Sequence, residues 1–198
     1  MINVFFISDT HFGHKNILEY EKEARPFASL EEMHEVMIER WNNVVKPKDV
    51  VYHLGDFCFG RKSLDVAERL NGKKKLVMGN HDTLPTAMYL QYFDKLYGMI
   101  FYNRCVLSHM PVSPKQLGAR WWLNIHGHLH SKRVQHCVDG LYSLKVNKGG
   151  EEKEMLVRSP FDSEFEDDPN YFNVSCEQNN LTPIHWDVIR ERLKEIDQ

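Results

Sequence analysis

The chain has 198 residues, of which 42% are hydrophobic, so it is long enough to bury a sizeable core and is not a disordered chain. Its formal net charge of -3 gives no general attraction to nucleic acids or to anionic membranes. The four cysteines are scattered, and no run of about 20 apolar residues is present. We therefore expect a single domain over residues 1–198, in the cytoplasm, with no signal peptide.

Patterns typical of strands and helices alternate in the first half of the chain. We expect a buried strand over residues 2–8 and a helix over about 30–43, where apolar residues recur at spacings of three and four. Ser29 and Glu32 fit a capping box at the start of this helix. We then expect a strand over 50–54, a helix over 63–70, a strand over 75–78 and a helix capped by Thr83. This alternation predicts a layered α/β fold with a central sheet flanked by helices.

The second half of the chain has more strand patterns. Residues 105–108 and 123–126 are expected strands, and 172–175 is a candidate for the last one. Residues 183–196 fit a C-terminal helix. The acidic segment 151–168, with prolines and serines at its end, is expected to form a surface loop.

Five polar motifs stand at the ends of expected strands. They are Asp9-Thr10-His11, Gly55-Asp56, Gly79-Asn80-His81-Asp82, Ser108-His109 and Gly127-His128-Leu129-His130. Ligands of open α/β sheets gather outside the carboxyl ends of the strands, so these loops could converge. Carboxylate, imidazole and amide oxygen suit manganese, iron, zinc or magnesium, and the lack of cysteine argues against a structural zinc site. Asp56, which follows a glycine, is the natural carboxylate to bridge two metal ions.

In this order the five motifs resemble those of the calcineurin-like metallophosphoesterase superfamily, over about residues 4–131. The short chain and the segment 9–16 are similar to small bacterial or phage members. The resemblance implies a β-sheet sandwich flanked by helices. It also implies a dinuclear, metal-dependent phosphoric ester hydrolase, with Mn²⁺ as the first expectation and Fe, Zn, Ni or Mg as alternatives.

The resemblance assigns metal ligands to the motifs. The ligands of the first metal would be Asp9, His11 and His130, and those of the second would be Asn80, His109 and His128. Asp56 would bind both ions. A shift of two residues in the last strand would put His126 in the place of His130, and the sequence leaves this alternative open.

Four further residues are expected to act on the substrate. The resemblance makes His81 catalytic, either as the proton donor to the leaving oxygen or as a group that stabilises the transition state, while Asp82 would orient it by a hydrogen bond. Alternatively, Asp82 would only cap the following helix. His14 and Arg25 follow the first motif and are candidates to bind the substrate phosphate, although a solvated loop is the common outcome for such residues.

The expected reaction is hydrolysis of a small phosphomonoester or phosphodiester, with nucleotides among the candidates. A hydroxide that bridges the two metals would attack phosphorus in line. A nuclease acting on DNA or RNA is an alternative that the charge of -3 does not favour. A non-catalytic scaffold on the same fold is another, but the presence of His81 and of a full ligand set favours an enzyme. No membrane partner is expected, and the sequence does not determine the oligomeric state.

Overall fold

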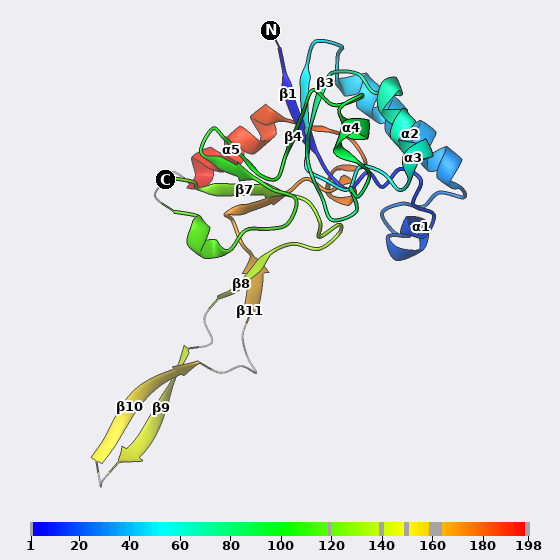
Figure 1. Cartoon of the computed structure of the whole chain (residues 1–198). Helices are drawn as coiled ribbons and strands as arrows, with labels where there is room; N and C mark the ends of the chain where they lie inside the picture. The colour runs from blue at the N-terminus through cyan, green and yellow to red at the C-terminus, as the bar shows by residue number, and fades with distance from the viewer. Residues whose placement is uncertain (1, 119, 139–140, 149–150, 159–163, 197–198) are drawn as a thin grey trace. The chain divides into compact units, whose positions relative to one another are not determined.

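The computed structural model describes residues 2–118, 120–138, 141–148, 151–158 and 164–196 (Figure 1). The chain divides into two compact units, one formed by residues 1–132 and 169–198 and the other by residues 133–168. All predicted site residues belong to the larger unit. None of the described helices is long and apolar enough to cross a membrane.

A five-stranded sheet forms the centre of the larger unit, in the order β13-β1-β2-β3-β4. Its strands are β1 (Val4–Ile7), β2 (Val50–His53), β3 (Lys73–Val77), β4 (Lys95–Tyr97) and β13 (Ile184–His185). Strands β1 to β4 run parallel to their neighbours, and only β13 pairs antiparallel, with β1. The carboxyl ends of β1, β2 and β3 therefore lie along one edge of the sheet.

A second sheet of four strands has the order β12-β7-β6-β5. Its strands are β5 (Ile100–Tyr102), β6 (Cys105–Leu107), β7 (Leu123–His126) and β12 (Tyr171–Asn173). Strands β6, β7 and β12 are parallel, so their carboxyl ends also meet. Just beyond the ends of β1 and β12, a parallel bridge joins Ser8 to Ser175. The two sheets thus meet at their carboxyl ends.

The helices of the larger unit are mostly short. They are α1 (Ile17–Tyr20), α2 (Leu30–Val44), α3 (Arg61–Leu64), α4 (Thr86–Tyr89) and α5 (Trp186–Ile196), with 3-10 turns η1 (Asp65–Arg69), η2 (Pro114–Gln116) and η3 (Cys176–Asn179). Helix α2 begins where the sequence predicts, because the Ser29 hydroxyl accepts the backbone N–H of Glu32 at 3.1 Å. The Glu32 carboxylate accepts the N–H of Ala28 rather than that of Ser29.

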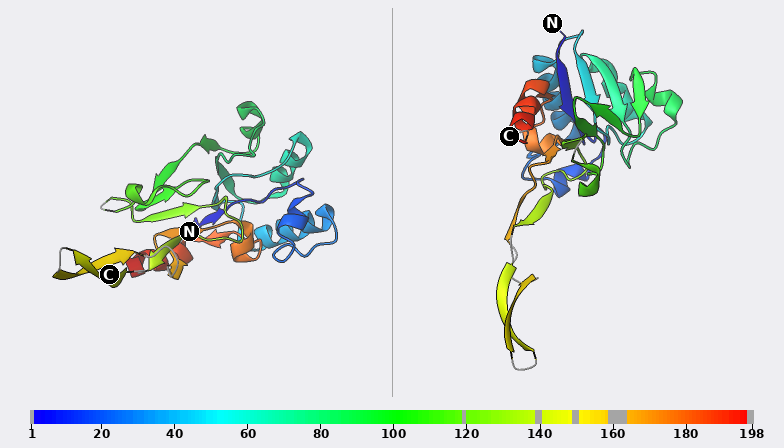
Figure 2. Two further views of the ribbon diagram at one scale, coloured as in Figure 1. Left: turned by 90° about the horizontal axis from the view of Figure 1, so that it is seen from below. Right: turned by 90° about the vertical axis from the view of Figure 1, so that its left-hand side faces the viewer.

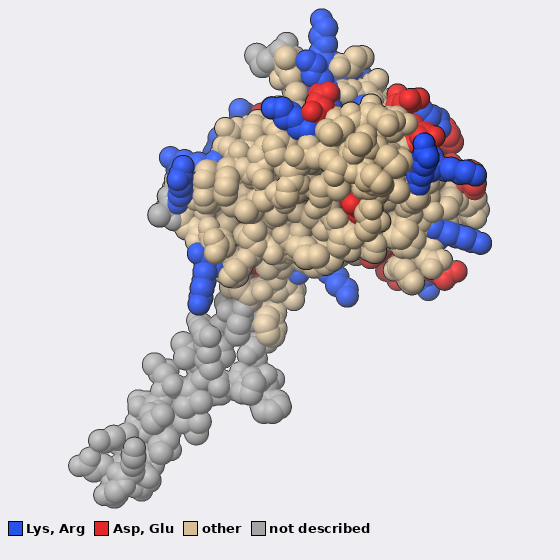
Figure 3. All heavy atoms as spheres, in the orientation of Figure 1, with Lys and Arg blue, Asp and Glu red and all other residues tan. Residues whose placement is uncertain are grey.

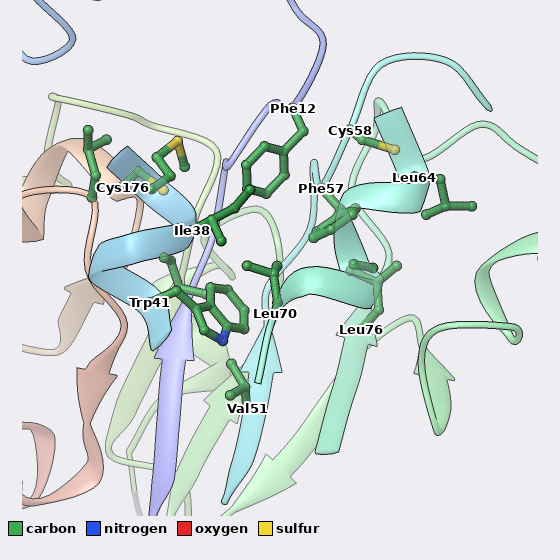
Figure 4. Close-up of a cluster of buried hydrophobic side chains, with 14 of the residues drawn as sticks. Phe12, Ile38, Trp41, Val51, Phe57, Cys58, Leu64, Leu70, Leu76 and Cys176 are labelled. Atoms are coloured by element: carbon green, nitrogen blue, oxygen red, sulfur yellow. The ribbon is translucent and has the colours of Figure 1, made fainter. Parts of the chain in front are cut away.

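Alternate residues of the central strands enter two hydrophobic clusters. On β1, Phe5 and Ile7 join the cluster under the helices, whereas Phe6 joins the one on the other face. Figure 4 shows the first cluster, in which Trp41 of α2 lies beside Val51 of β2. Trp41 is buried, and its indole N–H donates to the carbonyl of Asn71 at 2.9 Å. This packing holds α2 against the outer face of the five-stranded sheet.

The second cluster fills the space between the two sheets. Tyr52 of β2 and Val77 of β3 meet Leu107 of β6 and Ile125 of β7 in it. Ile189 brings helix α5 into the same cluster. The layers are therefore α2 and α3, the five-stranded sheet and the four-stranded sheet, as Figures 1 and 2 show. This arrangement confirms the predicted α/β class with a sheet sandwich flanked by helices.

Two predictions for the helices need correction. The helix expected over 183–196 begins only at Trp186, because Ile184–His185 extend the sheet as β13. Thr83 does not cap the helix that follows it, since α4 begins at Thr86 and Pro85 occupies its N-cap position. The ring of Pro85 fixes its own φ angle just before the first turn, and the helix begins there without a side-chain cap.

The second unit corrects the expected surface loop over residues 151–168. Two antiparallel pairs form there, β9 (Leu141–Lys148) with β10 (Glu151–Arg158), and β8 (Gln135–Val138) with β11 (Glu164–Asp167). Residues 159–163 lie outside the described part of the chain. The prediction was wrong because a two-stranded ribbon is held by backbone pairing and does not require the apolar alternation that identifies a strand in sequence.

Candidate metal centre

The loops after five parallel strands bring the seven predicted metal ligands together. Asp9 and His11 follow β1, and Asp56 follows β2. The remaining four follow β3, β6 and β7, namely Asn80, His109, His128 and His130. The backbone N–H of His128 donates to Asp9 Oδ2 at 2.9 Å, which ties the last loop to the first.

Asp9, His11 and His130 form the first group that could hold a metal ion, with one ligand atom from each within 4.8 Å of the others. Asp9 Oδ1 lies 3.8 Å from His11 Nε2 and 4.0 Å from His130 Nε2. The two imidazole rings stack with their centres 5.0 Å apart. His130, and not His126, therefore stands in the group that includes the first motif.

Asp9, Asp56 and His109 form a second such group. Asp56 Oδ2 lies 3.4 Å from His109 Nε2 and 3.7 Å from His11 Nε2. Because His11 belongs to the first group and His109 to the second, Asp56 stands between the two, as a bridging carboxylate would. Asn80 Oδ1 lies 2.9 Å from His109 Nε2, which adds an amide oxygen on the same side.

Several of these ligands have unusual backbone conformations. Positive φ angles of 50–70° occur at Asp9, His11, Asp56, His128 and His130. The left-handed region costs a non-glycine residue roughly 1–2 kcal/mol, so such conformations persist only where the surrounding structure imposes them. Five of the nine described non-glycine residues with positive φ are predicted ligands, which favours a functional role for this edge of the sheets.

Two glycines allow the loops to approach one another. A Cβ atom on Gly79 would collide with the carboxylate of Asp56, and one on Gly127 would collide with Ser8 and with Asp9. The glycines of the motifs therefore serve close packing between loops, as well as turning the chain.

Some buried polar atoms of the centre lack a partner among the described residues. They include Asp9 Oδ1 and both ring nitrogens of His11. An unsatisfied buried polar atom costs about 1–3 kcal/mol, so such atoms require an explanation. Carboxylate oxygen, imidazole nitrogen and amide oxygen are together the donor set of divalent metal ions. The residues present thus fit metal ions, which would satisfy these atoms.

The protonation states of His11 and Asp56 suit cation binding. Burial lowers the pKa of His11 to about 2, so its ring is neutral and its nitrogen lone pair is free at neutral pH. Burial acts to raise the pKa of Asp56, but the hydrogen bond and charge of His109 lower that pKa to about 2. Asp56 is therefore ionised and carries negative charge at the middle of the cluster.

The prediction that Arg25 binds substrate is corrected by its position. The side chain is fully buried, and all three guanidinium nitrogens donate to protein groups. Its partners are the carboxylate of Glu177, the carbonyls of Thr10 and Asp9, and the Sδ atom of Met33. With its charge paired and its N–H groups engaged behind the ligands, Arg25 has no free donor to offer a substrate phosphate.

The predicted role of Asp82 is also corrected. Its carboxylate accepts the backbone N–H groups of Asp56 and Gly79, both at 2.8 Å, and that of Phe57 at 3.0 Å. The ring of His81 is not among its partners in the described part of the chain. Asp82 therefore fixes the loop that carries Asp56, and it does not orient His81.

His81 lies at the open side of the centre. Its side chain is 44% exposed, and its Nε2 atom lies 4.0 Å from Asp56 Oδ2. The ring packs on Phe59 with a distance of 4.8 Å between centres, and Phe59 in turn stacks on His14 at 4.0 Å with the planes 10° apart. An aromatic support formed by Phe59 and His14 thus stands beside His81.

His126 and Glu177 complete the surroundings of the ligands. His126 is buried within β7, where its Nδ1 atom lies 2.8 Å from the carbonyl of Gly127. Glu177, which the sequence analysis missed, contacts His130 Nδ1 at 3.0 Å. The sequence feature that could have identified Glu177 is its position just after the expected strand 172–175, since the other site residues also follow strand ends.

Comparisons with known proteins agree with this geometry. The model of the family described as calcineurin-like phosphoesterase matches residues 2–190, so the chain belongs to this family. An uncharacterized protein of Methanocaldococcus jannaschii, MJ1445, is 39% identical over 140 residues, which cover 68% of this chain and 73% of that protein. The gene 66 protein of Mycobacterium phage D29 is 30% identical over 180 residues, covering 74% of this chain and 87% of the phage protein.

A solved structure has the same fold. The crystal structure of AQ665, a protein of unknown function from Aquifex aeolicus, is similar with a TM-score of 0.64 and 28% identity. The match covers 96% of this chain and 99% of that one. The phage and archaeal relatives are consistent with the predicted small member of the superfamily.

Proposed function

We propose that this protein is a dinuclear metal-dependent phosphoesterase that hydrolyses a small phosphomonoester or phosphodiester, with Mn²⁺ as the first candidate metal. The main support is the position of Asp56 Oδ2 between His11 and His109, at 3.7 and 3.4 Å from their Nε2 atoms. The two candidate ligand groups also share the buried carboxylate of Asp9, whose Oδ1 atom has no partner among the described residues.

Each side of the cluster would hold one ion. Asp9, His11 and His130 would bind the first and Asn80, His109 and His128 the second, with Asp56 between them. When bound, the two cations would supply an activated water and neutralise charge on the phosphoryl oxygens. The protein's contribution is to keep these side chains in place, through the strained loops and the hydrogen bonds of Asp82 and His128.

His81 would act as the proton donor. It is the exposed histidine nearest to Asp56, so it can reach a substrate that the ligands hold. A positioned histidine can protonate the leaving oxygen as the ester bond breaks. Of the two residues predicted to bind the phosphate, only His14 remains a candidate, with its ring centre 5.4 Å from that of His11 and 6.4 Å from that of His81.

A nuclease is the alternative with a clear structural test. On the face of the molecule in Figure 3, Lys and Arg side chains gather at the margin, where Asp and Glu side chains accompany them. The middle of this face carries almost no charged side chains. A nucleic-acid duplex needs a continuous basic track for its phosphates, and this face shows none.

The deciding experiment is an assay of metal-free protein reloaded with Mn²⁺. The substrates are p-nitrophenyl phosphate and bis-p-nitrophenyl phosphate, and the variants are Asp56→Asn and, as a matched control, the exposed Asp94→Asn. We expect turnover that requires Mn²⁺, disappears in Asp56→Asn and persists in Asp94→Asn. Metal-independent turnover, or none in a protein that binds no Mn²⁺, would refute the proposal. In a parallel assay with DNA and RNA as substrates, cleavage of either in preference to both esters would support the nuclease.

A further inference from the structure

A buried ion pair joins two distant segments of the chain directly behind the metal ligands. Arg25 NH2 lies 2.6 Å from Glu177 Oε1, and Arg25 Nε donates to the same oxygen at 2.7 Å. Both side chains are fully buried, and 152 residues separate them in sequence. A buried ion pair often stabilises a fold no better than apolar side chains of similar volume would. Its presence here is therefore weak evidence that its role is stability alone.

Glu177 contacts one ring nitrogen of His130 and leaves the other for the metal centre. Glu177 Oε1 lies 3.0 Å from His130 Nδ1, while Nε2 lies across the ring, 4.0 Å from Asp9 Oδ1. An ionised carboxylate can only accept a hydrogen bond, so Nδ1 carries the hydrogen. The lone pair of the neutral ring is then on Nε2 and faces Asp9.

The same contact does not determine the backbone position of His130. The carbonyl of His130 accepts the side-chain amides of Asn173 at 3.0 Å and Gln178 at 2.8 Å. These bonds hold the main chain whatever the ring does. The contact with Glu177 therefore acts on the ring alone, on its orientation and on its tautomer.

Arg25 extends the connection to the first ligand loop. Its NH1 and NH2 atoms donate to the carbonyls of Thr10 at 3.1 Å and Asp9 at 2.5 Å. This loop carries Asp9 and His11, whose φ angles of 57° and 50° need support from neighbouring groups. One guanidinium thus restrains the Asp9–His11 loop directly and His130 through Glu177.

We propose that Arg25 and Glu177 are positioning residues of the metal centre: Glu177 sets the tautomer and orientation of His130, and Arg25 holds Glu177 and the Asp9–His11 loop in register. This inference rests on the proposed function, because the Nε2 lone pair of His130 matters only if it binds a metal ion. A carboxylate that orients a ligating histidine typically contributes about 10–100-fold to metal affinity.

The first test needs neither metal nor substrate. Side-chain ¹⁵N NMR of the metal-free protein reports the tautomer of each histidine, and the signals of His130 are those that His130→Asn removes. We expect the neutral form of the His130 ring to carry its hydrogen on Nδ1. A neutral ring with its hydrogen on Nε2 would overturn the inference, whatever the protein hydrolyses.

The second test measures Mn²⁺ binding to the whole protein by calorimetry, with the ions per chain counted by elemental analysis. Glu177→Gln should weaken one Mn²⁺ by about 10–100-fold and leave the other nearly unchanged. The control Glu35→Gln, which removes the exposed pair with Arg69, should change neither. Unchanged affinity in folded Glu177→Gln, or an equal loss for both ions, would contradict the inference.

A further variant covers the case in which Glu177→Gln fails to fold. That change leaves the buried charge of Arg25 without its partner, which costs several kcal/mol. The double variant Arg25→Met with Glu177→Met removes both charges and should fold, with the same selective loss of one Mn²⁺. If the wild-type protein binds no Mn²⁺, the proposed function fails. If the wild type binds two ions and the double variant binds them equally well, only the positioning role of Arg25 and Glu177 fails.

Discussion

Asp82 Oδ2 accepts the backbone N–H of Asp56 at 2.8 Å, so the carboxylate of Asp82 fixes the loop that carries Asp56. The same carboxylate also receives the N–H groups of Phe57 and Gly79. Asp82 is buried, and these three bonds satisfy it without any contact to the substrate side of the centre. The loops after β2 and β3 are thereby joined where Asp56 must stand between two ligand groups.

Asp82→Asn should therefore act on the metal centre and on stability. An amide has one acceptor oxygen, so at least one of the three N–H groups loses its partner, at a cost of about 1–3 kcal/mol. We expect a lower melting temperature and weaker Mn²⁺ binding, measured by calorimetry. If Asp82 instead oriented His81, the variant would bind Mn²⁺ normally, and only the pH profile of kcat would change.

His81→Gln should reduce turnover without loss of metal. Removing a general acid typically costs about 10²–10⁴-fold in rate, and the loss is smaller for esters whose leaving group needs no proton. We expect a larger loss of kcat with phenyl phosphate than with p-nitrophenyl phosphate, and two Mn²⁺ per chain in both proteins. Equal losses for the two esters would contradict the role of proton donor.

Phe59→Leu tests the aromatic support of His81. The ring of Phe59 contacts those of both His14 and His81, with distances of 4.0 and 4.8 Å between ring centres. Leucine keeps apolar volume but cannot stack, so His81 should become less ordered, and kcat should fall by about tenfold while Mn²⁺ affinity stays the same. The variant Phe101→Leu, at an exposed ring stacked on Trp121, serves as the control and should be fully active.

Much of the centre could be predicted from the sequence because its ligands directly follow the ends of strands. Asp9, Asp56 and His109 each follow a buried apolar strand, and parallel strands bring their carboxyl ends together. The roles of Arg25 and Asp82 could not be predicted in this way. Whether a charged side chain faces the solvent or the interior depends on its partners, and Glu177, the partner of Arg25, is 152 positions away in the sequence.

The stability of the metal-free protein should depend on pH through His53. This residue is fully buried, outside the ligand set, and burial lowers its pKa from 6.5 to about 3. Its Nε2 atom lies 3.0 Å from the hydroxyl of Thr10, which itself donates to the carbonyl of Phe57 at 2.7 Å. The hydroxyl hydrogen is thus engaged, and the neutral ring of His53 donates to Thr10 through Nε2–H.

A histidine with a lowered pKa in the folded state binds its proton more readily when the chain unfolds. Its contribution to stability is therefore fully present above about pH 6.5 and is lost as the pH falls toward 3, with a slope of about 1.4 kcal/mol per pH unit for one proton. His126 and His11, whose pKa values burial lowers to about 4 and about 2, each add a further proton as the pH falls. Urea unfolding of the metal-free protein at pH 7, 6 and 5 measures the free energy of unfolding, and its slope with pH gives the combined effect of these histidines. In His53→Asn the slope below pH 6 should be smaller by about one proton, and an unchanged slope would show that His53 is not neutral in the folded protein.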